Sequence, residues 1–170
     1  YYIVENIDKT NVEIEIVTTN FSHKKKSQRE IIKGSKNKII NRNVKFTLLN
    51  EPKYNKNVSV KRFYSHYIFA KNVSRYLQNR KKPDLIYCSV PSLGAASVAA
   101  KYAKENNIKF IIDIQDLWPE AFQMVFNVPI ISNIIFYPMK KKANYIYKAA
   151  DEIVSVSETY KNRALEANKK

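Results

Sequence analysis

The sequence contains a single cysteine, Cys88, among its 170 residues. One thiol excludes an intrachain disulfide and a metal site built from several cysteines, and it is compatible with a reducing cytoplasm. Glycine is also scarce, because Gly34 and Gly94 are the only two. An open α/β domain that binds phosphates usually carries a glycine-rich first turn. Either this fold does not use such a turn, or the turn lies upstream of Tyr1.

The sequence also lacks long apolar runs, and it has few acidic residues. No stretch approaches the roughly 20 apolar residues of a membrane-spanning helix, and the first residues lack the pattern of a signal peptide. Against 30 Lys and Arg there are 15 Asp and Glu, which leaves a net charge of +15. This charge favours anionic partners such as nucleic acid, phosphorylated substrates or acidic lipid headgroups. The hydrophobic share of 45% is that of a globular chain, and the length fits one domain.

Strand-like and helix-like patterns alternate along the chain. Period-two alternation or short buried apolar runs predict strands at residues 12–18, 44–49, 84–89, 108–114 and 152–156. Helical spacing or capping signals predict helices at residues 63–80, 91–106, 132–147 and from Ser157-Glu158 onward. The polar residues 19–38 predict a long loop in which a short helix is allowed. This order predicts a doubly wound, Rossmann-like α/β fold with a mostly parallel sheet and helices on both faces.

The segment that follows the predicted strand 108–114 carries the richest chemistry. Ligands of open α/β sheets bind at the carboxyl ends of the strands, and here three carboxylates, an indole and a proline lie within eight residues: Asp113, Asp116, Trp118, Pro119 and Glu120. A carboxylate at this edge can orient sugar hydroxyls or act as a base, and an indole can stack on a sugar ring. The alternative is that Asp116 caps the next helix and Trp118 belongs to the core.

Two other loops are predicted to reach the same edge. Ser89, Pro91 and Ser92 form a strand-to-helix turn whose hydroxyls and free helix N-terminus can hold an anion or a hydroxyl. Ordinary turn chemistry is the alternative. Asn20 and His23 lie in the loop after residue 18, where His23 is either a base or, by default, part of a solvated basic loop. The sequence assigns no role to His66.

Basic and aromatic residues together suggest a membrane-facing surface. Lysine clusters stand at residues 24–26, 81–82 and 140–142, and the last is flanked by Phe136, Tyr137, Tyr145 and Tyr147. Lysines can contact lipid phosphates while aromatic rings lie at headgroup level. Taken singly, each cluster is a solvated face.

Four segments give the sequence a family resemblance, and their order and spacing agree over nearly the whole chain: residues 12–21 (VEIEIVTTNF), 87–92 (YCSVPS), 113–120 (DIQDLWPE) and 150–157 (ADEIVSVS). The chain resembles the amino-terminal domain of the retaining family-four glycosyltransferases with the GT-B fold. The run at 113–120 is similar to that of the branch that builds bacterial capsule and O-antigen polysaccharides.

In such enzymes two Rossmann-like domains face each other, the first for the acceptor and the second for the nucleotide-sugar donor. The resemblance implies that this chain is the acceptor half, inactive alone, with its opening strand and glycine-rich loop before Tyr1 and the donor domain after Lys170. It implies no cofactor and no required metal. The implied acceptor is a glycan linked to polyprenyl diphosphate, and the implied location is the cytoplasm, peripheral to the inner face of the plasma membrane.

The resemblance also implies the site residues. Many relatives have a histidine where this sequence has Gln115, and glutamine cannot serve as a base. Asp116 and Asp113 are therefore the expected catalytic residues that contact the acceptor hydroxyl, with acceptor positioning a firmer expectation than base catalysis. The expected acceptor-binding residues are Gln115, Trp118, Glu120, Ser89, Pro91, Ser92, Asn20 and His23.

Two other classes of function remain open at this point. The net charge of +15 alone motivates a nucleic-acid-binding α/β module, although no helix-turn-helix, zinc-finger or ribonucleoprotein signature supports it. A Rossmann-type dehydrogenase domain is the other, and the missing G-x-G-x-x-G motif argues against it. We therefore expect a nucleotide sugar and a glycan as partners rather than nucleic acid.

Overall fold

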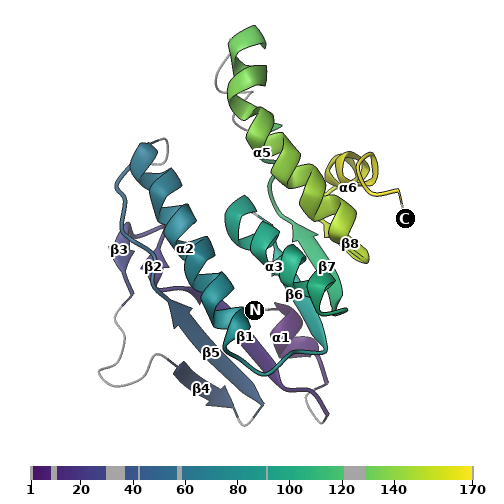
Figure 1. Ribbon diagram of the computed structural model, residues 1–170. Helices are drawn as coiled ribbons and strands as arrows, with labels where there is room; N and C mark the ends of the chain where they lie inside the picture. Colours follow the sequence, from purple (N-terminus) through teal and green to yellow (C-terminus); the bar gives the residue numbers. More distant parts are fainter. Residues whose placement is uncertain are drawn as a thin grey trace. The chain divides into compact units, whose positions relative to one another are not determined.

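The computed structural model describes residues 2–8, 11–29, 37–41, 43–56, 59–90, 92–120 and 129–169 (Figure 1). The chain forms two compact units, Tyr1–Asn72 and Val73–Lys170. Helix α2 (Val60–Gln78) begins in the first unit and ends in the second.

The first unit contains a mixed three-stranded sheet. Strand β1 (Ile14–Thr19) pairs in parallel with β5 (Val44–Leu49), and β4 (Asn37–Asn41) pairs with β5 in the antiparallel sense, so the strand order is β1-β5-β4. A short helix, α1 (Tyr2–Asn6), precedes this sheet.

The segment after β1 is folded rather than an open loop. Strands β2 (Phe21–Ser22) and β3 (Ser27–Gln28) form a small antiparallel hairpin. Phe21 is fully buried. Packing of this one aromatic side chain therefore anchors a segment that is otherwise polar. The sequence predicts a loop at residues 19–38, in which a short helix is allowed. For residues 21–28, which form the hairpin, this prediction is wrong. Residues 30–36 lie outside the described part of the chain.

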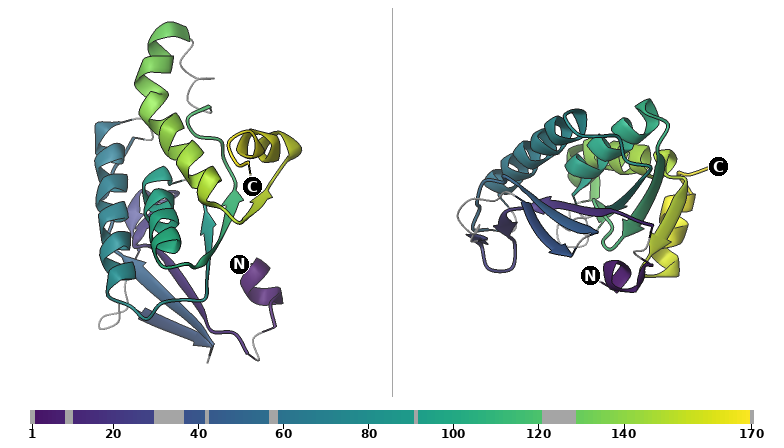
Figure 2. Two further views of the ribbon diagram at one scale, coloured as in Figure 1. Left: turned by 45° about the vertical axis from the view of Figure 1, so that its right-hand side comes forward. Right: turned by 90° about the horizontal axis from the view of Figure 1, so that it is seen from below.

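The second unit contains a parallel three-stranded sheet with helices (Figure 2). Its strands are ordered β6-β7-β8 and are β6 (Leu85–Ser89), β7 (Lys109–Ile114) and β8 (Glu152–Ser155). Its helices are α3 (Leu93–Glu105), α5 (Pro129–Ala149) and α6 (Glu158–Leu165). Strands and helices alternate, and parallel strands lie in open sheets, so the predicted α/β class is confirmed.

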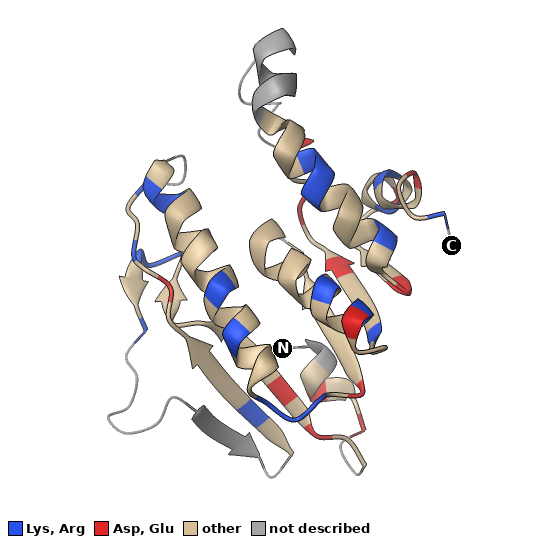
Figure 3. Cartoon of the chain, in the orientation of Figure 1, with Lys and Arg blue, Asp and Glu red and all other residues tan. Residues whose placement is uncertain are grey.

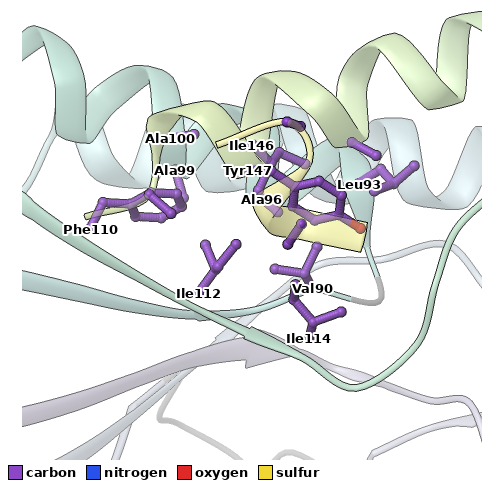
Figure 4. Close-up of a cluster of buried hydrophobic side chains, with 14 of the residues drawn as sticks. Val90, Leu93, Ala96, Ala99, Ala100, Phe110, Ile112, Ile114, Ile146 and Tyr147 are labelled. Atoms are coloured by element: carbon purple, nitrogen blue, oxygen red, sulfur yellow. The ribbon is translucent and has the colours of Figure 1, made fainter. Parts of the chain in front are cut away.

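The core of the second unit forms between β7 and the helices. Along β7 the buried side chains alternate, and Phe110, Ile112 and Ile114 all point into one cluster (Figure 4). Ala96 and Ala100 of α3 are fully buried in the same cluster. Because alanine has a small side chain, the helix backbone can lie close to the strands, as the alanine-rich sequence predicts.

Element boundaries follow local sequence signals closely. Helix α6 begins after Ser157, whose hydroxyl accepts a hydrogen bond from the Tyr160 amide, so the predicted serine cap is confirmed. Helix α5 begins at Pro129, earlier than predicted, because proline suits the first turn of a helix. Within the described residues, no helix is both long and apolar enough to cross a membrane.

Candidate functional site

The carboxyl edge of the parallel sheet in the second unit brings three predicted site residues together. Ser89 is the last residue of β6, and its register partner on β7 is Asp113. Gln115 follows the end of β7, and its Nε2 donates a hydrogen bond of 2.8 Å to Asp113 Oδ2. The three side-chain positions therefore belong to one edge, as the strand pattern predicts.

Asp113 also acts electrostatically on the neighbouring strand. Burial, reinforced by the Asp113 carboxylate, raises the pKa of the Tyr87 hydroxyl to about 12. The same two causes, with burial the larger, raise the pKa of the Cys88 thiol to about 12. Both groups are therefore neutral at pH 7, and Cys88 is not an activated nucleophile.

Asp116 is held by the indole that follows it. Trp118 Nε1 donates a hydrogen bond of 2.8 Å to Asp116 Oδ2. Trp118 is only 7% exposed and belongs to the core cluster of the second unit. The core alternative therefore describes this side chain, and a ring so covered cannot stack on a sugar. The peptide bond between Trp118 and Pro119 is cis.

Glu120 is bound within the protein. Its Oε1 lies 2.6 Å from Arg163 Nε, and Arg163 also donates a hydrogen bond of 2.9 Å to Asn144 Oδ1. The Arg163 guanidinium lies 5.5 Å from the ring centroid of Tyr147. Burial and the Glu120 carboxylate raise the pKa of Tyr147 to about 12, although Arg163 opposes the shift. These contacts connect the 113–120 segment with α5 and α6.

The turn after β6 is described only in part. Ser92 is the N-cap residue of α3, but its hydroxyl makes no capping hydrogen bond. Among the described residues, its Oγ is buried without a hydrogen-bond partner. Pro91 lies outside the described residues, so its predicted role has no structural counterpart here.

Asn20 and His23 lie in the first unit, whereas the other predicted site residues lie in the second. Asn20 supports the backbone of a neighbouring residue: its Oδ1 accepts a hydrogen bond of 2.9 Å from the Glu51 amide. Its Nδ2 donates to Asn50 Oδ1 at 3.3 Å. Within its own unit, Asn20 therefore has a structural role in shaping the chain at Glu51.

His23 belongs to a cluster that the sequence does not predict. Glu51, two residues after the end of β5, is 1% exposed. Its Oε1 accepts a hydrogen bond of 2.9 Å from Ser65 and lies 4.0 Å from His66 Nε2, and its Oε2 lies 3.6 Å from His23 Nε2. The one signal of this cluster in the sequence is that His23 and His66 are the only two histidines of the chain.

The cluster is electrostatically unusual. Burial lowers the pKa of His66 to about 4, with contributions from Arg62 and His23 in the same direction and an opposing contribution from Glu51. Burial also lowers the pKa of His23, against the effect of Glu51. The hydroxyl of the buried Tyr54 lies 2.6 Å from His23 Nδ1. Burial raises the pKa of the Tyr54 hydroxyl.

No protein-family model matches this sequence, and a search of the curated proteins finds no match.

Proposed function

We propose that this chain is the acceptor-binding half of a retaining glycosyltransferase that moves a sugar from a nucleotide-sugar donor to a glycan. The observation that carries the proposal is the edge of the β6-β7 pair, where Ser89 and Asp113 are register partners and Gln115 and Asp116 follow directly. Hydroxyl, amide and carboxylate groups at the carboxyl edge of a parallel sheet suit the hydroxyls of a sugar.

Asp116 positions the acceptor in this proposal. The hydrogen bond from Trp118 fixes the orientation of its carboxylate, and a carboxylate has further lone pairs with which to accept from an acceptor hydroxyl. Asp113 is oriented in the same way by Gln115. Two carboxylates held in this way can each accept a hydrogen bond from an acceptor hydroxyl.

Strand pairing within each unit supports a Rossmann-like interpretation. In the first unit β1 and β5 are parallel neighbours and β4 is antiparallel to β5, and in the second unit β6, β7 and β8 are parallel neighbours in chain order. Rossmann-type dehydrogenases share such pairing, so the proposal of a glycosyltransferase rests on the residues at the strand ends.

Charge supports an anionic, lipid-linked acceptor. Lys and Arg residues recur along α2, α3 and α5 (Figure 3), and the net charge is +15. Tyr137 and Tyr145 of α5 are exposed, whereas Phe136 and Tyr147, which the sequence also assigns to a membrane-facing surface, are buried. In this proposal, lysines 140–142 with the two exposed tyrosines contact the inner face of the plasma membrane.

The single tryptophan offers a direct test on the chain itself. Because Trp118 donates to Asp116, binding of an acceptor at Asp116 should change its fluorescence. The probe is a monosaccharide linked to polyprenyl diphosphate in detergent micelles. We expect saturable binding that Asp116→Asn weakens by about 10- to 100-fold, the value of a hydrogen bond to a charged group.

Glu105→Gln is the matched control, because it also converts a carboxylate to an amide and affects only an exposed pair with Lys101. It should bind as the unaltered chain does. Equal binding by Asp116→Asn would remove Asp116 from the site. Binding of duplex DNA with a steep salt dependence, without acceptor binding, would instead support the nucleic-acid-binding alternative.

A further inference from the structure

Three potential metal-ligand side chains converge in the first unit. His23 lies in the turn between β2 and β3, Glu51 follows β5, and His66 lies on α2. One ligand atom from each lies within 4.8 Å of the others. They reach one point from three different elements, so the arrangement depends on the fold and not on sequence spacing.

The ligand set and its dimensions match zinc. Two imidazole nitrogens and one carboxylate form a His₂Glu set, which binds Zn²⁺ in proteins through bonds of about 2.0–2.2 Å. Tetrahedral ligands at such bond lengths are about 3.4 Å apart. Glu51 Oε2 lies 3.6 Å from His23 Nε2, and the other carboxylate oxygen, Oε1, lies 4.0 Å from His66 Nε2. One atom from each of the three side chains lies within 4.8 Å of the others, so side-chain movements of about 1 Å would bring them to the spacing that Zn²⁺ requires.

The Glu51 carboxylate supplies an independent reason for a cation. It is almost fully buried, and a buried charge is costly unless it is paired or bound to a metal. Ser65 donates to Oε1. Among the described residues, Oε2 is buried without a hydrogen-bond partner, and it is the oxygen that lies near His23.

The surroundings hold the ligands in place. The Glu51 amide donates to Asn20, and the Glu51 carbonyl accepts from Gln28 Nε2, so the backbone is fixed on both sides. His23 Nδ1 pairs with the Tyr54 hydroxyl at 2.6 Å. A hydrogen bond at the ring nitrogen that does not bind the metal is the usual device that orients a histidine ligand.

We propose that His23, Glu51 and His66 form a Zn²⁺-binding site in the first unit, with water as the fourth ligand. The His23 side chain is 46% exposed, which gives the ion access from solvent and leaves room for that water. Lys26 and Arg62 lie beside Tyr54, and their positive charges weaken the affinity for a cation. The site is therefore of moderate affinity.

The test uses the two histidines as reporters, since the chain has no others. The chain is prepared without a polyhistidine tag and with Cys88→Ser, which removes the one thiol that could compete for the metal. Zn²⁺ is titrated by calorimetry and by imidazole ¹H–¹⁵N spectra. We expect one ion per chain and shifts of both imidazoles at the same metal equivalent.

Glu51→Gln keeps the size of the side chain and removes its charge. We expect it to weaken Zn²⁺ binding more than about 100-fold, beyond the loss typical of second-shell changes, whereas Glu105→Gln leaves binding unchanged. Absence of Zn²⁺ binding, or a shift of only one imidazole, would overturn the proposal. So would unchanged affinity in Glu51→Gln. The imidazole spectra of the Cys88→Ser chain decide the matter even if Glu51→Gln does not fold.

Discussion

Removal of the Arg163 guanidinium should destabilise the second unit markedly. Arg163 pairs with Glu120, donates to Asn144 and lies over the Tyr147 ring. Its side chain is 14% exposed and that of Glu120 is 29% exposed. Arg163→Met keeps the apolar part of the side chain and leaves the Glu120 carboxylate without its cation.

The expected loss can be worked out from these contacts. A hydrogen bond to a charged group contributes about 1.5–3 kcal/mol, the bond to Asn144 about 1 kcal/mol and the cation–π contact about 0.5–1 kcal/mol. Because both side chains are partly exposed, solvent screening reduces the sum. We expect Arg163→Met to lower the free energy of unfolding by about 3 kcal/mol.

Urea unfolding followed by Trp118 fluorescence measures this loss, because Trp118 lies in the core of the same unit. A second substitution, Glu120→Gln, should restore part of the stability to the Arg163→Met chain. It removes the uncompensated charge, which is the main cost of breaking a buried pair. The double-mutant cycle should therefore give a coupling of about 2 kcal/mol.

Lys161→Met is the matched control on the same helix. Lys161 pairs with Glu158, but both side chains are well exposed, so the pair contributes about 0–1 kcal/mol. If Arg163→Met costs no more than Lys161→Met, or if the coupling is near zero, the buried-pair reasoning is refuted.

Three further predictions concern the sheet of the second unit. Ile112→Ala, at a fully buried position, should lower the free energy of unfolding by about 2–5 kcal/mol, whereas Val154→Ala, at a position 44% exposed, should cost about 0.5 kcal/mol or less; equal losses in urea unfolding would contradict the burial pattern. Cys88 should react with iodoacetamide at pH 8 about 1,000-fold more slowly in the native chain than in the denatured one, because its pKa is raised from 9.0 to about 12. Rapid alkylation of the native chain would show that the thiol is not shielded. The same shift favours the neutral thiol in the folded state, so the contribution of Cys88 to the free energy of unfolding should be intact below pH 9 and lost as the pH rises from 9 towards 12.

Local patterns were sufficient to predict most strands and helices. Strand β5 has the predicted bounds because its apolar run ends at Asn50, Glu51 and Pro52, which do not continue a strand. The alanines of α3 predict a helix that lies close to a sheet, and four of the five, Ala96, Ala99, Ala100 and Ala103, are buried there. Where hydrophobic periodicity and stop signals agree, the sequence alone defines an element.

The hairpin at β2 and β3 shows where such patterns fail. Its strands have two residues each, too few for any period to be visible. Phe21 is its one buried aromatic, and the surrounding lysines indicate a solvated loop. The energy that folds this segment comes from contacts with distant residues such as Tyr54, whose ring lies 5.0 Å from that of Phe21.

The candidate sites differ in the same way. Asp113 and Ser89 were predictable together because parallel strands place their carboxyl ends at one edge, so two separate linear signals converge by topology. No rule of topology predicts that Glu51 and His66 lie together. A glutamate after a strand belongs to the signal that ends the strand, and the sequence assigns no role to His66. Only the packing of α2 beside the end of β5 makes Glu51 a buried carboxylate with Ser65 and His66 as neighbours. Because burial turns an ordinary acidic residue into one that needs a compensating charge, the role proposed for Glu51 depends on the fold and not on its place in the sequence.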